Sequence, residues 1–164
     1  MMRVLWTRES EDKNNFYEVI EKYFTKLSGR IEQVRKEDFE SVFGCELATR
    51  NKNIVYIWKC EKKIPRLNGF SDILYIGQTK QSFKNRYLKY AKHEASTKAN
   101  KLKYQTIIDN YGAISIYVCD FSIFCDTLLK SEGQLLWWYF QNHCEYPPIN
   151  YTQTTVRNDI VKIL

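Results

Sequence analysis

The chain has 164 residues and a mass of 19.7 kDa, enough for one domain with a hydrophobic core and a modest extension but not for two independent domains. Hydrophobic residues make up 44% and charged residues 27%, which excludes a disordered chain and predicts a folded globular protein. No stretch approaches the roughly 20 apolar residues of a membrane helix, and the opening MMRVLWTRESEDKNN lacks the apolar core of a secretory signal. We therefore expect a soluble, cytoplasmic protein with no membrane partner.

The net charge of +6 is concentrated in one segment. The first fifty residues hold nine Lys and Arg against ten Asp and Glu, and their near-neutral balance contributes nothing to the surplus. Residues 80–103 hold eight basic side chains and a single acidic one, Glu94. Such a basic segment predicts a polyanionic partner, although surplus lysine also serves solubility.

The cysteines indicate neither disulfides nor a zinc site. Their count is odd, no CxxC pair occurs, and neither histidine completes a zinc-ligand spacing. We expect reduced, mostly buried thiols. The residues concerned are Cys45, Cys60, Cys119, Cys125 and Cys144, with His93 and His143.

Residues 1–50 are predicted to form an N-terminal helical extension. Apolar residues at three- and four-residue spacing predict an amphipathic helix over 14–27, and a second helix is expected over 35–43. The polar run 49–53 is typical of a linker. The extension could act as a helical cap, a DNA clamp or a dimer surface. Its near-neutral charge makes the DNA clamp the least favoured of these three roles.

Two strands with both faces buried are predicted next, over 54–60 and 73–77, because both segments are rich in β-branched and aromatic residues. The segment between them holds Pro65, Asn68-Gly69 and Asp72, which predicts a long hairpin loop. The two strands should therefore be antiparallel neighbours.

The remainder alternates helices with one more strand. Helices are expected over 82–95 and 100–110, followed by a strand over 114–118 with one face inward. A last helix over 127–142 should be capped by Asp126. After the helical preface, the predicted order is therefore β-β-α-α-β-α.

An ordered set of motifs falls on these elements: Val55-Tyr56, Tyr75-Ile76-Gly77 followed by Gln78-Thr79, then Arg86, Glu132, and Pro147-Pro148-Ile149-Asn150. Over residues 54–150 the set resembles the GIY-YIG nuclease family. The resemblance implies an α+β fold with a small three-stranded antiparallel sheet flanked by helices, in a nuclease domain over 51–152 followed by a tail over 153–164. Two positions depart from the family pattern: Ile54 replaces its first glycine, and Tyr90 stands where many homing-type members have histidine.

Glu132 is the candidate metal ligand. It falls within the apolar stripe of the last helix, between Leu128 and Leu135, where an unpaired carboxylate is costly. A cation is the natural partner, and the resemblance implies one Mg²⁺ or Mn²⁺ held by this carboxylate, with water and phosphate oxygens in the other positions. The alternative is an edge glutamate paired with a lysine.

Arg86 and Tyr90 are expected one turn apart on one helix face. A guanidinium can hold two phosphate oxygens at once. The alternative for Arg86 is a solvated arginine within a basic helix.

Tyr56 and Tyr75 lie on adjacent predicted strands. By resemblance Tyr56 positions or deprotonates the attacking water, while Tyr75 and Tyr90 hydrogen-bond the phosphate or the water. Deprotonating a phenol at neutral pH costs about 4 kcal/mol unless cations lower its pKa. The alternative is packing, since tyrosine is common in strands. Further candidates for substrate contact are Gly77, Lys80, Lys84, Lys89, His93 and Asn150, with a structural role expected for Asn150 and a close backbone approach for Gly77.

These observations predict a divalent-metal-dependent DNA endonuclease of restriction-like, viral or mobile-element type. To cut both strands it would act as a homodimer. Two alternatives stay open: a catalytically inactive nucleic-acid-binding module on the same fold, and a nuclease for branched DNA or RNA.

Overall fold

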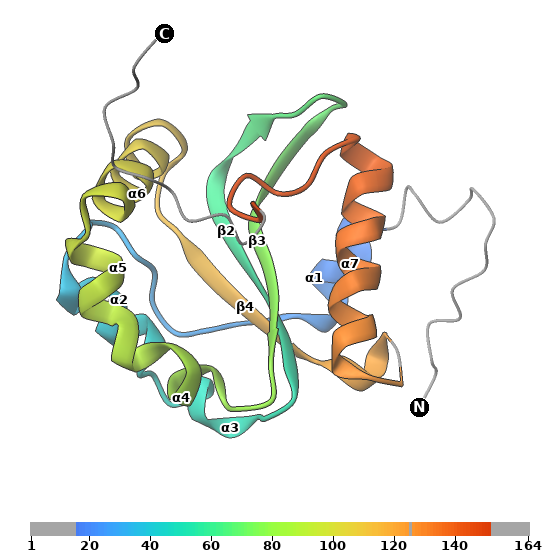
Figure 1. Ribbon diagram of the computed structural model, residues 1–164, viewed down its shortest axis with the longest axis horizontal. Coiled ribbons are helices and arrows are strands. Elements are labelled where there is room, and N and C mark those ends of the chain that lie inside the picture. Colours follow the sequence, from blue (N-terminus) through green and yellow to red (C-terminus); the bar gives the residue numbers. More distant parts are fainter. Residues whose placement is uncertain (1–15, 125, 152–164) are drawn as a thin grey trace, which may run out of the picture.

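The computed structural model describes residues 16–124 and 126–151 and shows an α+β fold (Figure 1). One four-stranded antiparallel sheet has the order β1-β4-β2-β3. Helices cover both of its faces, with α2, α4, α5 and α6 on one side and α1 and α7 on the other (Figure 1). The strands are β1 Thr25–Lys26, β2 Ile54–Pro65, β3 Phe70–Thr79 and β4 Ser115–Asp120.

The helices follow the predicted positions closely. The segment expected as one helix over 82–95 consists of α4, a 3₁₀ turn and α5, and the expected linker over 49–53 begins inside the short helix α3. Thr127 caps α7 in place of the predicted Asp126, because the Thr127 hydroxyl accepts the bond from the Lys130 amide at 3.3 Å. The bounds are α1 Phe16–Tyr23, α2 Lys36–Phe43, α3 Leu47–Arg50, α4 Phe83–Tyr87, 3₁₀ turn Leu88–Tyr90, α5 Ala91–Ser96, α6 Lys98–Tyr111, 3₁₀ turn Phe121–Ile123 and α7 Leu128–His143.

The fourth strand, β1, corrects the prediction of three strands. Helix α1 ends at Tyr23, and the residues expected to be its last turn pair with β4 instead, where the Leu27 amide donates to the Ile116 carbonyl at 2.8 Å. Phe24 and Leu27 are three residues apart, a spacing that puts side chains on one face of a helix but on opposite faces of a strand. Here Phe24 enters the core under α7 and Leu27 enters the core under α2.

The hairpin between β2 and β3 is longer than predicted. The segment expected as a loop continues both strands, and the chain turns only over residues 66–69, where the Arg66 amide donates to the Gly69 carbonyl at 2.9 Å. Gly69 has a φ of 71°, which glycine adopts without strain. The strand register shifts between Lys59 and Ile64, so this part of the hairpin is irregular, although Cys60 and Ile64 still belong to the core.

The two central strands separate two hydrophobic cores. Tyr56 and Trp58 of β2 enter the core shared with α2, α4, α5 and α6, whereas Val55 and Ile57 enter the core shared with α1 and α7. This confirms the prediction that both faces of β2 are buried. β4 is also buried on both faces, because Cys119 lies in the α7 core, so the prediction of a single inward face was wrong.

None of the helices within residues 16–124 and 126–151 combines the length and apolar character needed to cross a membrane.

The free edge of β3 is covered by the segment that follows α7. The Ile149 amide donates to the Leu74 carbonyl at 2.9 Å, and the Asn150 side chain both accepts from the Ile76 amide and donates to the Ile76 carbonyl, each at 2.8 Å. Asn150 thus satisfies the backbone of an edge strand as a neighbouring strand would. These contacts agree with the structural role expected for Asn150.

The change Asn150→Ala should therefore destabilise the protein by about 1 to 3 kcal/mol, because two backbone groups of Ile76 lose their partners. The free energy of unfolding in urea measures this effect. Asn85→Ala, at an exposed position in α4, is the matched control and should change stability by less than about 0.5 kcal/mol. Equal stabilities of the two variants would contradict the proposed edge-capping role.

Candidate functional site

Three tyrosines form a cluster on the face of the sheet that α4 covers. Tyr56 and Tyr75 come from the neighbouring strands β2 and β3, and their rings stack with centroids 6.0 Å apart. Tyr87, at the end of α4, places its hydroxyl 2.7 Å from the hydroxyl of Tyr56. The cluster therefore joins the two strands to the basic helical segment through a hydrogen bond between phenols.

Gly77 makes room for this cluster. It is the cross-strand partner of Tyr56, and a Cβ on Gly77 would lie 2.6 Å from three atoms of the Tyr56 phenol. Such a separation is far inside van der Waals contact, so only glycine lets the ring lie flat against β3. The expected close approach at Gly77 is thus to another element of the protein, the side chain of Tyr56.

Burial keeps all three phenols protonated. It raises the pKa of Tyr56 far above the ordinary value for tyrosine, with the neighbouring Tyr87 and Tyr75 adding to the rise. Burial also raises the pKa of Tyr87, and it raises the pKa of Tyr75 with a further contribution from the negative charge of Glu132. The positive charge of nearby Arg86 lowers the pKa of Tyr56, but this effect is smaller than each of those that raise it. In this arrangement the phenols are hydrogen-bonding groups, and Tyr56 is poorly suited to deprotonate water.

Arg86 lies at the solvent-facing side of the cluster. Its guanidinium carbon is 5.7 Å from the ring centroid of Tyr87 and 5.8 Å from that of Tyr90, so it is held between two aromatic rings. Within the described part of the chain, its N–H groups make no hydrogen bond or ion pair. Tyr90 is 38% exposed. Arg86 and Tyr90 are neighbours as predicted. Arg86 is itself exposed, which also agrees with the alternative of a solvated arginine within a basic helix.

Glu132 approaches the cluster from α7. Its carboxylate is half-buried and lies close enough to Tyr75 to raise the pKa of that phenol. Burial raises the pKa of Glu132 itself, and no described side chain hydrogen-bonds it or forms an ion pair with it. The lysine partner considered as an alternative is therefore absent among the described residues.

A divalent cation fits these surroundings, because it would supply the missing counter-charge to a partly desolvated carboxylate. Among residues 16–124 and 126–151, no three His, Cys, Asp or Glu side chains are grouped as metal ligands. Water and substrate oxygens would thus have to supply most of the ligands of an ion held by Glu132. This arrangement suits Mg²⁺, which keeps several water or phosphate ligands.

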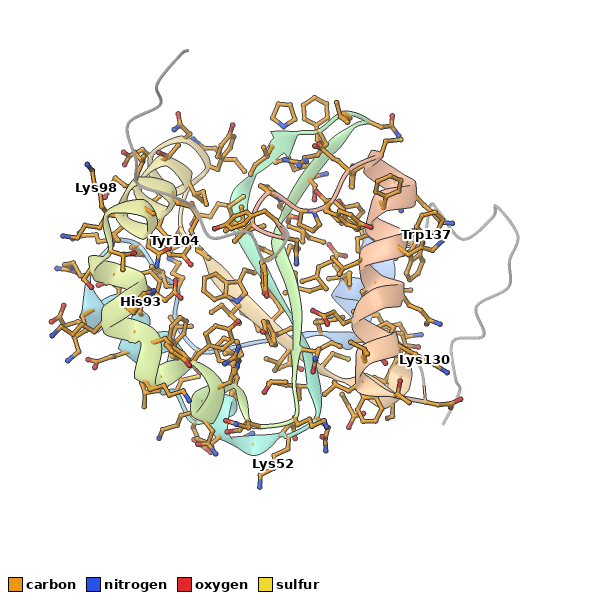
Figure 2. All side chains as sticks on the ribbon, viewed as in Figure 1. Lys52, His93, Lys98, Tyr104, Lys130 and Trp137 are labelled. Atoms are coloured by element: carbon orange, nitrogen blue, oxygen red, sulfur yellow. The ribbon has the colours of Figure 1, made fainter. Side chains whose placement is uncertain are left out.

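The basic segment adds positive charge on α4, α5 and α6, the helices on this side of the sheet. None of its lysines or its arginine forms an ion pair with a described carboxylate, and Glu94 hydrogen-bonds the Tyr104 hydroxyl at 2.6 Å. Figure 2 shows Lys98 at the outer surface of α6, away from α7. Of the predicted contacts, Lys80 and Lys89 are exposed and Lys84 is half-buried.

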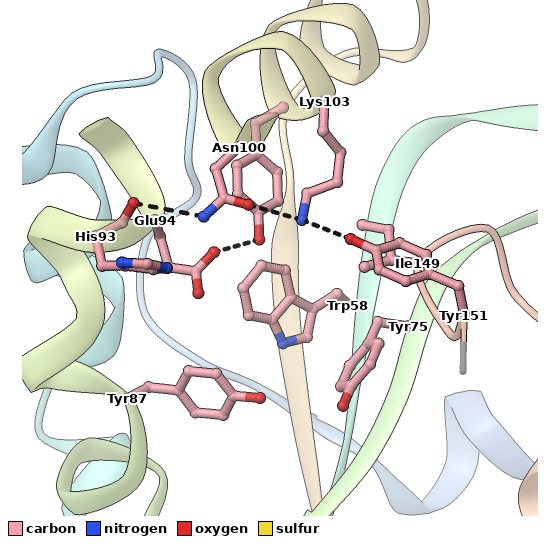
Figure 3. A pocket seen from close by; sticks show the side chains of 10 residues that line it. Trp58, Tyr75, Tyr87, His93, Glu94, Asn100, Lys103, Ile149 and Tyr151 are labelled. Atoms are coloured by element: carbon pink, nitrogen blue, oxygen red, sulfur yellow. Dashed lines mark hydrogen bonds between the residues drawn. The ribbon is translucent and has the colours of Figure 1, made fainter. Parts of the chain in front are cut away.

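A pocket of about 400 Å³ opens beside the tyrosine cluster (Figure 3). Tyr75 and Tyr87 form its wall toward the cluster, and His93 lines its far side, so His93 faces this pocket and not the phenols of the cluster. Sequence reasoning missed Tyr87 and the pocket. Only the position of Tyr87 directly after Arg86 could have drawn attention to it.

Comparisons of the chain with protein-family models, with curated proteins and with solved structures gave no match.

The substitution Gly77→Ala should destabilise the protein by about 1 to 3 kcal/mol, because the added methyl group forces the Tyr56 ring out of its place. Gly133→Ala in α7 is the matched control, since a Cβ there meets nothing within 4 Å. That control should stabilise the helix by about 0.5 to 1 kcal/mol. Urea unfolding of both variants measures the difference, and a Gly77→Ala protein as stable as wild type would show that the Tyr56 ring is not confined.

Proposed function

We propose that this chain is a GIY-YIG-type endonuclease that hydrolyses phosphodiester bonds of DNA with the help of a divalent cation. The observation that supports the proposal most is the grouping of Tyr56, Tyr75 and Arg86 with Glu132, which come from two strands and two helices. These are the side chains that the resemblance assigns to the site. A half-buried carboxylate without a described counter-charge is unfavourable in a purely structural cluster, so Glu132 supports the proposal more than the exposed Arg86 does.

Substrate phosphate is bound by Arg86 and the surrounding lysines. The planar guanidinium, fixed between Tyr87 and Tyr90, can donate two parallel hydrogen bonds to one phosphate. Lys80, Lys84 and Lys89 add attraction that depends on salt and not on sequence. In catalysis the guanidinium stabilises the negative charge that increases on the phosphate oxygens in the transition state.

The phenols position the reacting groups. Tyr75, between Glu132 and Tyr56, donates a hydrogen bond to a phosphate oxygen or to the attacking water. Tyr56 acts through its hydrogen bond with Tyr87, which holds the Tyr56 hydroxyl in one orientation. Glu132 is the ligand for Mg²⁺ or Mn²⁺, and such an ion supplies charge neutralisation and activation of water when bound.

The biological setting follows from the substrate. An enzyme of this kind acts on DNA inside the cell, in restriction, in a mobile element or in a virus. One site cuts one strand at a time, so cleavage of both strands at a fixed position requires a homodimer.

Glu132→Gln should lower Mg²⁺-dependent nicking of DNA by about 10²- to 10³-fold, since the amide cannot replace the charge of the carboxylate. Arg86→Lys should lower it by at least about 10-fold, because an ammonium cannot donate two parallel bonds. Plasmid and genomic DNA serve together as substrates, so that a short recognition sequence is not missed. Gel electrophoresis quantifies the products.

The matched controls are Glu37→Gln, an exposed glutamate of α2, and Arg50→Lys, whose guanidinium pairs with Glu46. Both should retain wild-type nicking. Undiminished nicking by Glu132→Gln protein would refute the site assignment. DNA binding without any cleavage by wild-type protein would identify an inactive binding module, and cleavage confined to branched DNA or RNA would change the substrate class.

Glu132→Gln should also raise the urea midpoint at pH 7 in the absence of divalent ions, because burial disfavours the charged carboxylate. Because the pKa of Glu132 is higher in the folded protein than in the unfolded chain, folding favours the protonated form of this side chain. Wild-type stability therefore increases relative to the variant as pH falls through the raised pKa, and the difference vanishes near pH 4. Urea titrations from pH 4 to pH 8 measure this trend. A variant less stable than wild type at pH 7 would contradict the absence of a counter-charge.

A further inference from the structure

The pocket of about 400 Å³ beside the tyrosine cluster has aromatic walls. The ring of Trp58 forms one side, and Tyr104 of α6 lies nearly parallel to it, with centroids 6.0 Å apart and planes at 23°. Tyr75 and Tyr87 pack at an angle against Trp58, with centroids 6.3 Å and 5.8 Å away. Trp58 and Tyr104 are almost completely buried, so the half-buried rings of Tyr75 and Tyr87 and the exposed ring of Tyr151 are the aromatic surfaces that a planar ligand can contact.

Trp58 also offers a hydrogen-bond donor that the protein does not use. The residue is only 3% exposed, yet its indole nitrogen has no hydrogen-bond partner in the described part of the chain. Figure 3 shows this nitrogen facing the space between Tyr87 and Tyr75. Buried donors are almost always paired, so an unpaired one at a pocket wall points to an acceptor that arrives with a ligand.

The rim of the pocket is polar and carries both signs of charge. One oxygen of Glu94 accepts from the Tyr104 hydroxyl at 2.6 Å, and Figure 3 shows the other oxygen directed toward the side of Tyr87. Lys103 donates to the Asn100 side chain at 3.1 Å and to the Tyr151 hydroxyl at 3.3 Å. No described carboxylate neutralises Lys103.

We propose that this pocket holds one unpaired nucleotide of the substrate, next to the phosphate that is cleaved. The inference rests on the proposed nuclease function and deepens it: the substrate class is DNA with a nucleotide that is unpaired or can leave the stack. The base lies among the aromatic rings, and Lys103 neutralises its phosphate. Tyr75 and Tyr87 belong both to this pocket and to the tyrosine cluster, so a nucleotide in the pocket adjoins a phosphate at Arg86.

The rim also defines which bases fit best. The free oxygen of Glu94 accepts from an exocyclic amino group, as carboxylates do from cytosine. Cytosine, adenine and guanine carry such a group and thymine does not. The pocket should therefore bind thymine nucleotides more weakly than cytosine nucleotides of similar size.

The test is a titration of the ¹⁵N-labelled full chain with dCMP and dTMP, without divalent ions, followed through the assigned indole resonance of Trp58. The expected result is a saturable shift with dCMP and an affinity for dTMP lower by at least about threefold. Asn100→Ala and Lys103→Ala should each weaken dCMP binding by about fivefold or more. Lys101→Ala is the matched control, since this lysine is exposed on the same helix and does not line the pocket.

Three results overturn the inference: no saturable shift, equal affinities for the two nucleotides, or the same loss in Lys101→Ala as in Lys103→Ala protein. None of these measurements involves cleavage. If dCMP binds as expected while wild-type protein cleaves no DNA, the nuclease proposal fails and the nucleotide pocket stands. If DNA is cleaved but dCMP does not bind, the pocket inference alone fails.

Discussion

The contact between the Tyr56 ring and the backbone of Gly77 is the constraint on which the candidate site depends. At directly opposed positions, β2 carries the large side chain of Tyr56 and β3 carries a glycine, which has no side chain. The ring then lies over β3, where it stacks on Tyr75 and meets the hydroxyl of Tyr87. Without this flat approach, the phenol of Tyr56 would be displaced from its contacts with Tyr75 and Tyr87.

Around this contact lie charged groups that no described side chain neutralises. Within residues 16–124 and 126–151, Arg86 stands between two aromatic rings without a carboxylate, and Glu132 stands half-buried without a cationic side chain. The half-buried carboxylate of Glu132 is the costlier of the two, because Arg86 is exposed and water screens its charge.

The sequence predicted the helices and central strands well wherever the spacing of apolar residues had one interpretation. Helix α2 and strands β2 and β3 are examples, since Phe39, Val42 and Phe43 fit only a helix and Ile54 to Cys60 only a buried strand. Residues 24–27 misled because a three-residue spacing is compatible with one face of a helix and with two faces of a strand. Asp126 and Thr127 are both good capping residues, so the sequence could not choose between them.

For the site, the sequence predicted that Arg86 and Tyr90 are neighbours because this depends only on helical spacing. The hydrogen bond from Tyr87 to Tyr56 could not be predicted, since it depends on how α4 sits on the sheet. The same holds for the pocket beside Trp58, which exists only once α5 and α6 cover β2. The desolvation of Tyr56, which disfavours its phenolate, likewise follows from tertiary burial.

The segment that covers β3 also limits how copies of the chain could assemble. Asn150 and Ile149 occupy the hydrogen-bonding groups of Ile76 and Leu74, so another polypeptide cannot extend the sheet by adding a strand there. At the opposite edge, β1 pairs over only two residues, which offers a short template.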